Sequence, residues 1–276
     1  MLLTTLLIFL TSVLAGFLGS LTGLGGGVVV TPVLALLFHV KLRYAMGASL
    51  VSVIATSSGA ASAYVREGYS NVRIGLFLEI ATTMGAIGGA HLSAHLPTSV
   101  LSITLGVVLL YSAYSSTRSL PDEVDVSDSD PLARKLRLNG NFPENGQKKN
   151  YVVRRVKSGF AMMLSAGLVS GLLGIGSGAL KVIAMDRIMR IPFKVSTSTS
   201  NFMIGVTAAA SAGVYLRRGY VHPDVVMPVM LGVLLGSLIG ARLLGGARIQ
   251  SLRVLFAIVV GALALEMIYG GFTGRL

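Results

Sequence analysis

The chain contains no cysteine and no tryptophan, and only 12% of its 276 residues are Asp, Glu, Lys or Arg. Soluble domains carry about 25% charged residues. The absence of cysteine excludes disulfides, cysteine-ligated metals, iron–sulfur clusters and a cysteine nucleophile. Because 53% of the residues are hydrophobic and the mean hydropathy is +0.76, the composition predicts a protein of the lipid bilayer.

Charged residues and histidine are missing from five long stretches, which are 2–38, 44–65, 98–117, 158–180 and 195–216. A membrane-spanning helix needs about 20 mostly apolar residues, and barrel strands would alternate apolar with polar residues. We therefore predict an all-α polytopic protein of the cell membrane. Residues 1–20 lack a basic segment and continue into more apolar sequence, which favours a retained helix over a cleaved signal peptide.

The two halves of the chain are similar to each other. A shift of 151 residues aligns them without a gap over most of their length. A repeated Tyr-x-Arg-x-Gly-Tyr pattern is not explained by composition, and it lies at 64–69 and 215–220. We predict a first transmembrane repeat over residues 1–117, a polar basic linker over 118–157 and a second transmembrane repeat over 158–276.

Each repeat holds five apolar segments, near 2–21, 26–38, 45–64, 74–95 and 98–117, then near 158–174, 177–189, 196–215, 225–245 and 250–270. An odd number of crossings makes the repeats inverted in topology, as in many secondary transporters. The sequence allows ten crossings, or six crossings with two re-entrant hairpins. Basic residues of the linker favour a cytoplasmic linker, although Lys41, Arg43, Arg217 and Arg218 would then lie outside.

Clusters of glycine stand where the first apolar segment of each repeat passes into the second, as Gly23-Leu24-Gly25-Gly26-Gly27 and Gly174-Ile175-Gly176-Ser177-Gly178. Glycine costs about 1 kcal/mol relative to alanine within a helix, so each cluster predicts a broken, or re-entrant, helix. The restarting helix presents free amides that can hold an anion near the midplane. Close helix packing is the alternative role. The candidate residues are Gly25, Gly26, Gly27, Gly176, Ser177 and Gly178.

Hydroxyl and amide side chains follow each glycine cluster. They can replace water around an oxyanion without a charge that would trap it, and the candidates are Ser49, Ser52, Ser200 and Asn201. The alternative is hydrogen bonding of these side chains to the backbone of their own helix.

Lys181 is a lone cation inside an apolar segment, and Glu79 is a lone acid within residues 74–90. Ionisable groups inside a membrane are costly and commonly functional. Lys181 is therefore a candidate anion ligand, unless it snorkels or pairs with Asp186. Glu79 is a candidate for proton coupling, unless it serves a helix contact.

Other functional classes find little support in the sequence. The four histidines have no metal-ligand spacing, and no nucleophile elbow or H-E-x-x-H motif is present. We expect no metal, no cofactor and no catalytic residue, and no binding of nucleic acid because a basic recognition module is missing. The expected partners are the bilayer and a small anion, with a homodimer left open.

The glycine motif followed by Pro32, the Ala48-Ser49 region, the duplication and the chain length together resemble the TauE/SafE sulfite exporter family. The resemblance implies transport of small sulfur-containing anions such as sulfite, thiosulfate or organosulfonates. It also implies that Gly25, Gly26, Gly27, Gly176 and Gly178 lie near the substrate. Ser177 and Ile183 depart from the family pattern, where glycine and proline would be expected.

A negative-inside potential drives a dianion outward by about 4.6 kcal/mol at 100 mV. The sequence therefore favours export. Proton-coupled uptake of another small anion and a membrane scaffold without transport activity are the alternatives, and an intramembrane enzyme is the weakest interpretation.

Overall fold

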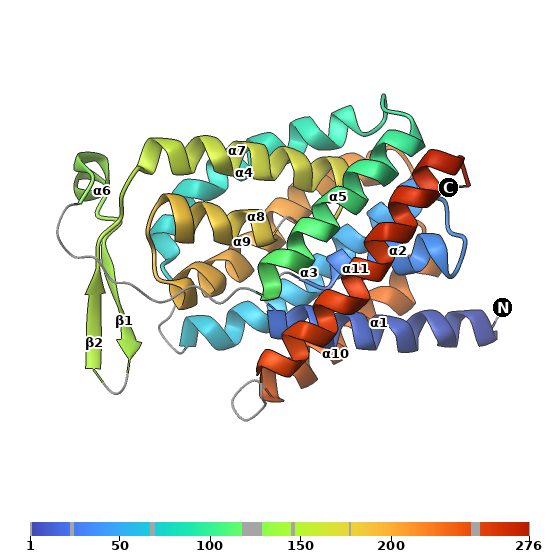
Figure 1. The fold of residues 1–276 in the computed structure, drawn as a ribbon, viewed down its shortest axis with the longest axis horizontal. Coiled ribbons are helices and arrows are strands. Elements are labelled where there is room, and N and C mark those ends of the chain that lie inside the picture. Colours follow the sequence, from blue (N-terminus) through green and yellow to red (C-terminus); the bar gives the residue numbers. More distant parts are fainter. Residues whose placement is uncertain are drawn as a thin grey trace.

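The computed structural model describes residues 2–22, 25–66, 70–117, 129–144, 147–176, 178–243 and 249–275. Helices form almost all of this part of the chain (Figure 1). The first half contains α1 (Leu2–Thr22), α2 (Gly27–Leu36), α3 (Leu42–Arg66), α4 (Val72–Leu92) and α5 (Thr98–Thr117). The second contains α7 (Val156–Leu173), α8 (Gly178–Ile183), the π-helical turn η1 (Ala184–Ile188), α9 (Phe193–Arg217), α10 (Pro223–Leu243) and α11 (Ile249–Thr273).

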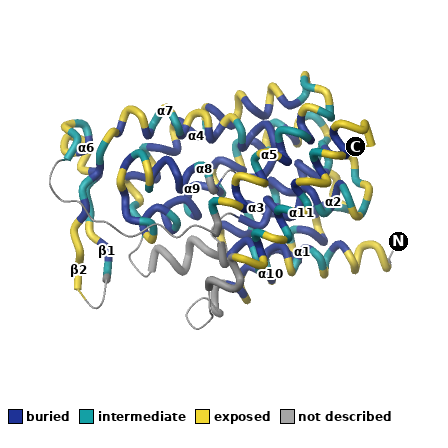
Figure 2. The backbone as a smooth tube through the Cα atoms, in the orientation of Figure 1, coloured by how far each residue is buried: buried dark blue, intermediate teal, exposed yellow. Residues whose placement is uncertain are grey.

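Within the described residues, six helices are long and apolar enough to cross a membrane, namely α1, α4, α5, α7, α10 and α11. Large apolar side chains on the outer faces of these helices are exposed, among them Leu14, Met84 and Ile258. Figure 2 shows this exposure along the outer helices and burial toward the centre. An apolar exterior of this extent suits lipid rather than water. The predicted all-α polytopic membrane protein is confirmed.

α2 and α8 are short. A helix of 10 residues, the length of α2, rises about 15 Å, about half of the hydrocarbon thickness. α8 has 6 residues and continues into η1. Ten full crossings therefore do not fit these lengths. α2 turns back along α1, where a Cβ on Gly19 would approach the Cα of Gly26 to 2.6 Å, so glycine permits this close hairpin.

Helices of the two halves pack against each other in exchanged pairs. α1 lies along α10, α4 along α7, α5 along α11 and α3 along α9. Equivalent glycines form the closest contacts. A Cβ on Gly85 would overlap the carbonyl of Leu164, and one on Gly236 would overlap the carbonyl of Val13. Gly85 and Gly236 are 151 residues apart, as are Val13 and Leu164. Small residues at such interfaces let helix backbones approach closely.

The described part of the linker is a small folded unit. It contains α6 (Pro131–Lys135) and an antiparallel hairpin of β1 (Gly140–Glu144) and β2 (Gln147–Tyr151). Phe142, Tyr151 and Val153 are buried in a cluster with residues of α4 and α7. Asn71 Nδ2 also donates to Tyr151 Oη at 2.7 Å. The linker, whose composition is polar and basic, thus contributes its few apolar residues to a small buried core. Both chain termini lie at the opposite end of the molecule (Figure 1).

Candidate functional site

The two glycine-rich breaks meet at the centre of the molecule. Gly25 and Gly176 have positive φ angles of 80° and 81°, which glycine adopts without steric cost. A Cβ on Gly176 would lie 3.0 Å from both Val53 and Ile204, and one on Gly25 would lie 4.0 Å and 3.8 Å from the same side chains. Val53 and Ile204 are themselves 151 residues apart. One apolar pair, equivalent in the two halves, therefore separates the breaks.

Ser49 and Ser200 each hydrogen-bond to the first residue of a short helix. Ser49 Oγ donates to Gly27 O at 3.1 Å and Ser200 Oγ donates to Gly178 O at 3.3 Å. These bonds hold the restarting helices against α3 and α9. Ser52 donates instead to Ser49 O within its own helix. The predicted hydroxyls thus lie around the breaks, with their protons directed to backbone carbonyls. Ser177 lies outside the described residues.

Asn201 borders a small cavity beside the first break. The residue is buried, and its Nδ2 has no hydrogen-bond partner. The cavity measures about 10 Å3 and is lined by Gly19, Ser20, Gly25, Val53, Thr56, Ser57, Asn201 and Ile204. A volume of 10–15 Å3 is about what one water molecule requires. The cavity is therefore no larger than one water molecule, and a residue with an unused amide donor lines it.

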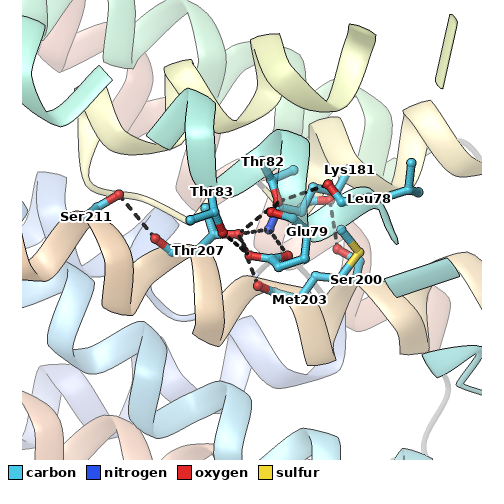
Figure 3. A network of polar contacts seen from close by, with 10 residues as sticks. Leu78, Glu79, Thr82, Thr83, Lys181, Ser200, Met203, Thr207 and Ser211 are labelled. Atoms are coloured by element: carbon cyan, nitrogen blue, oxygen red, sulfur yellow. Dashed lines mark hydrogen bonds and ion pairs between the residues drawn. The ribbon is translucent and has the colours of Figure 1, made fainter. Parts of the chain in front are cut away.

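Lys181 and Glu79 form a second polar group around Thr207 of α9 (Figure 3). Lys181 Nζ lies 3.7 Å from Glu79 Oε2. Thr207 Oγ1 accepts a hydrogen bond from Lys181 Nζ and donates to Glu79 Oε1. Thr83 Oγ1 also donates to Oε1 at 3.2 Å. The two intramembrane ionisable residues therefore contact each other, and Lys181 does not depend on Asp186 for an ion partner.

Thr207, Val53 and Ile204 are the residues that sequence reasoning did not assign to the site. The 151-residue register contains a signal for them, because it pairs Thr56 with Thr207 and Val53 with Ile204. No such signal exists for the ion pair. The register matches Lys181 with Val30 and Glu79 with Met230, so the pair has no counterpart in the other half.

The described residues contain no group of three or more His, Asp or Glu side chains arranged to hold a metal ion. The groups at the centre are amide, hydroxyl and backbone donors, together with one ammonium and one carboxylate. Such a set can hold an anion by hydrogen bonds and charge.

A bundle of apolar helices with two broken helices meeting at its centre defines a polytopic membrane protein with the parts of a secondary transporter. The model of the family described as sulfite exporter TauE/SafE matches residues 8–267. The chain belongs to this family.

Relatives extend over nearly the whole chain. The probable membrane transporter protein YunE of Bacillus subtilis is 25% identical over 266 residues, covering 94% of this chain and 95% of the relative. YdhB of the same organism, described in the same words, is 28% identical and covers 86% and 87%. MJ0441 of Methanocaldococcus jannaschii, another probable membrane transporter protein, is 22% identical and covers 95% and 94%. No solved structure matches the chain. The protein is thus a multi-pass membrane transporter.

Proposed function

We propose that this transporter exports a small sulfur-containing anion, such as sulfite, thiosulfate or an organosulfonate, and binds it where the two glycine-rich breaks meet. Asn201 carries the proposal. Its amide is buried, lacks a hydrogen-bond partner and borders a cavity beside Gly25. A buried donor without a partner costs about 1–3 kcal/mol, and an oxyanion oxygen would satisfy it when the site opens.

Backbone donors complete the proposed site. α2 begins at Gly27, directly after the break, and the first N–H groups of a helix have no partner within that helix. Together with Asn201 they supply neutral donors from α2 and α9. Lys181 supplies the positive charge. Residues without a side chain would keep the backbone donors accessible to the anion, and these are Gly25, Gly26, Gly27, Gly176 and Gly178. Ser49 and Ser200 would hold the restarting helices in position.

The site is proposed to lie between two inverted repeats, residues 1–117 and 158–276. The equivalent glycine contacts of α1 with α10 and of α7 with α4 support this arrangement. We also propose a cytoplasmic linker. Arg73, Arg134, Lys135, Arg154, Arg155, Lys157, Arg187 and Lys194 lie in or beside it, and positive residues gather on the cytoplasmic side.

Export follows from the charge of the substrate. A membrane potential of 100 mV, negative inside, contributes about 2.3 kcal/mol per charge toward outward movement of an anion. No catalytic role is proposed for any residue.

The test is anion flux in proteoliposomes at a fixed membrane potential, with sulfite, thiosulfate, sulfate and chloride as probes. Sulfur oxyanions are expected to move in preference to chloride. Asn201→Ala should lower flux at least tenfold, since one charge-assisted hydrogen bond is worth about 1.5–3 kcal/mol. Asn150→Ala, at an exposed position of β2, is the matched control. Folded protein that moves none of these anions would refute the proposed substrate class and favour a scaffold.

A further inference from the structure

Lys181 and Glu79 come from different halves of the chain and are buried together. The Lys181 side chain is fully buried and that of Glu79 is 8% exposed. Lys181 lies on α8, Glu79 on α4, and Thr207 of α9 bridges them. Figure 3 shows the three side chains directed toward one another. The pair therefore links three helices beside the central breaks.

The two oxygens of Glu79 have unequal surroundings. Oε1 accepts hydrogen bonds from Thr83 and Thr207. Oε2 is buried without a hydrogen-bond partner and has only the ion pair with Lys181 at 3.7 Å. This separation exceeds a hydrogen-bond distance. Oε2 is thus the position at which a proton can bind without displacing an existing hydrogen bond.

Other titratable groups on the helices packed against α4 lie in their terminal turns. These groups are Lys157 on α7 and Lys194, Tyr215 and Arg217 on α9. Tyr215 Oη donates to the carbonyls of Gly171 and Leu172. In the described structure, the charged side chain that reaches Glu79 is Lys181.

The charge of the site limits what it can accept. One ammonium and one carboxylate give a net charge of zero. An anion that entered alone would leave a buried negative charge without compensation, which is strongly unfavourable in a membrane interior. If Glu79 takes up a proton at the same time, Lys181 can pair with the anion. A monoanion is then fully compensated, and the uncompensated charge that a dianion leaves falls from two to one.

We propose that the transported anion and one proton bind together, with Glu79 as the proton acceptor. The inference rests on the proposed function. A proton from water bonds to Oε2 of Glu79 and neutralises the carboxylate. The ion pair with Lys181 is then lost, and the Lys181 ammonium pairs with an oxygen of the anion. On release, the anion leaves, the proton returns to water and the ion pair forms again.

The stoichiometry follows from the asymmetry of the two halves. The positions equivalent to Lys181 and Glu79 are Val30 and Met230. Val30 is buried among apolar residues. Among the described residues, the equivalent positions of the other half hold no second pair, and the proposed stoichiometry is one proton per anion. A monoanion then moves without net charge, so its own concentration gradient and not the potential drives its export. A dianion still carries one negative charge and is driven outward by the potential.

The experiment measures anion and proton flux together in proteoliposomes. Methanesulfonate serves as a monoanion and thiosulfate as a dianion, because neither changes protonation near neutral pH. We expect one proton per anion from a pH-sensitive dye, and methanesulfonate flux that does not respond to the membrane potential. At limiting anion concentration, flux should fall as the pH rises, because fewer protons are available to bind together with the anion.

Three variants separate coupling from folding. Glu79→Gln removes the proton acceptor and should abolish proton movement and pH dependence, and the thiosulfate flux that remains should be uncoupled from protons. Glu266→Gln, at an exposed acid of α11, should leave both unchanged. The double variant Glu79→Gln with Lys181→Met removes both charges, a change that often leaves stability unaltered. The double variant should fold and remain monodisperse in detergent micelles. Its anion flux should be at least tenfold lower than that of Glu79→Gln alone.

The outcomes distinguish the two proposals. Absence of flux from folded parent protein would refute the proposed function itself. Anion flux without proton movement, or unchanged pH dependence in Glu79→Gln, would refute proton coupling while the transport proposal stands. Full flux by the double variant would show that the ion pair is structural only.

Discussion

Ser49 and Ser200 make the same hydrogen bond in the two halves, each to the carbonyl of the glycine that begins a short helix. Both serines are fully buried. Each bond therefore fixes one restarting helix to the long helix that follows it, α2 to α3 and α8 to α9.

Ser49→Ala and Ser200→Ala are expected to weaken the fold to a similar extent. The loss of a buried hydrogen bond costs about 1 kcal/mol, which corresponds to a drop in Tm of about 2–4 °C. Thermal unfolding in detergent measures this change. Ser165→Ala is the matched control, since Ser165 is exposed and bonds within its own helix. A loss in one half without a loss in the other would contradict equivalent roles.

Gly176→Ala tests whether the break at Gly176 requires glycine both for its positive φ angle and for its close approach to Val53 and Ile204. Gly219 also has a positive φ, of 72°, but a Cβ there would meet nothing within 4 Å. Gly219→Ala should therefore cost only the conformational strain, about 1–2 kcal/mol. Gly176→Ala should lower Tm further and reduce anion flux, because its Cβ also crowds Val53 and Ile204. Equal effects of the two variants would argue against a tight central contact.

The proposed orientation can be tested directly because the chain has no native cysteine. Lys148→Cys places a thiol on β2 of the linker, and Arg275→Cys places one near the carboxyl terminus. A membrane-impermeant maleimide should label Lys148→Cys in inverted vesicles and Arg275→Cys in intact cells. The opposite pattern would reverse the orientation, and labelling of both from one side would conflict with the positions of linker and termini in Figure 1.

Tyr151 gives the linker unit a defined response to alkaline pH. Burial raises the pKa of Tyr151 to about 12, although the hydrogen bond from Asn71 opposes this effect. The folded pKa exceeds the unfolded value of about 10, so the unfolded state loses its proton first. The contribution of the neutral hydroxyl is complete below pH 10 and is lost as the pH rises toward 12.

Tyrosinate absorbance measures this titration as the difference between the parent and Tyr151→Phe. The titration of Tyr151 should have a midpoint near pH 12 in folded protein and near pH 10 in unfolded protein. Limited proteolysis measures the unfolding of the linker unit over the same pH range. Tyr269→Phe, at an exposed residue, provides the comparison. A normal midpoint for Tyr151 in folded protein would mean that the hairpin is not docked.

The helices could be predicted because a long charge-free segment in lipid must satisfy its backbone hydrogen bonds internally, which a helix does. The breaks could be predicted because Gly25 and Gly176 stand in equivalent clusters. The position of Val53 and Ile204 beside both breaks is implicit in the same register. By contrast, Lys181 and Glu79 meet across three helices and have no equivalents, so neither periodicity nor duplication reports their contact. The docked hairpin escaped prediction since only a few residues, such as Phe142 and Val153, provide its core.

The exchanged packing of the helices also determines when the protein can complete its structure during synthesis. α4 meets its partner α7 after one linker has been made, but α1 packs along a glycine-lined face of α10. α1 has no α10 to pack against until residues 223–243 have entered the membrane. Contacts between segments so distant in the chain form slowly. Although α1 is made long before α10, it is therefore among the last helices to reach its final place.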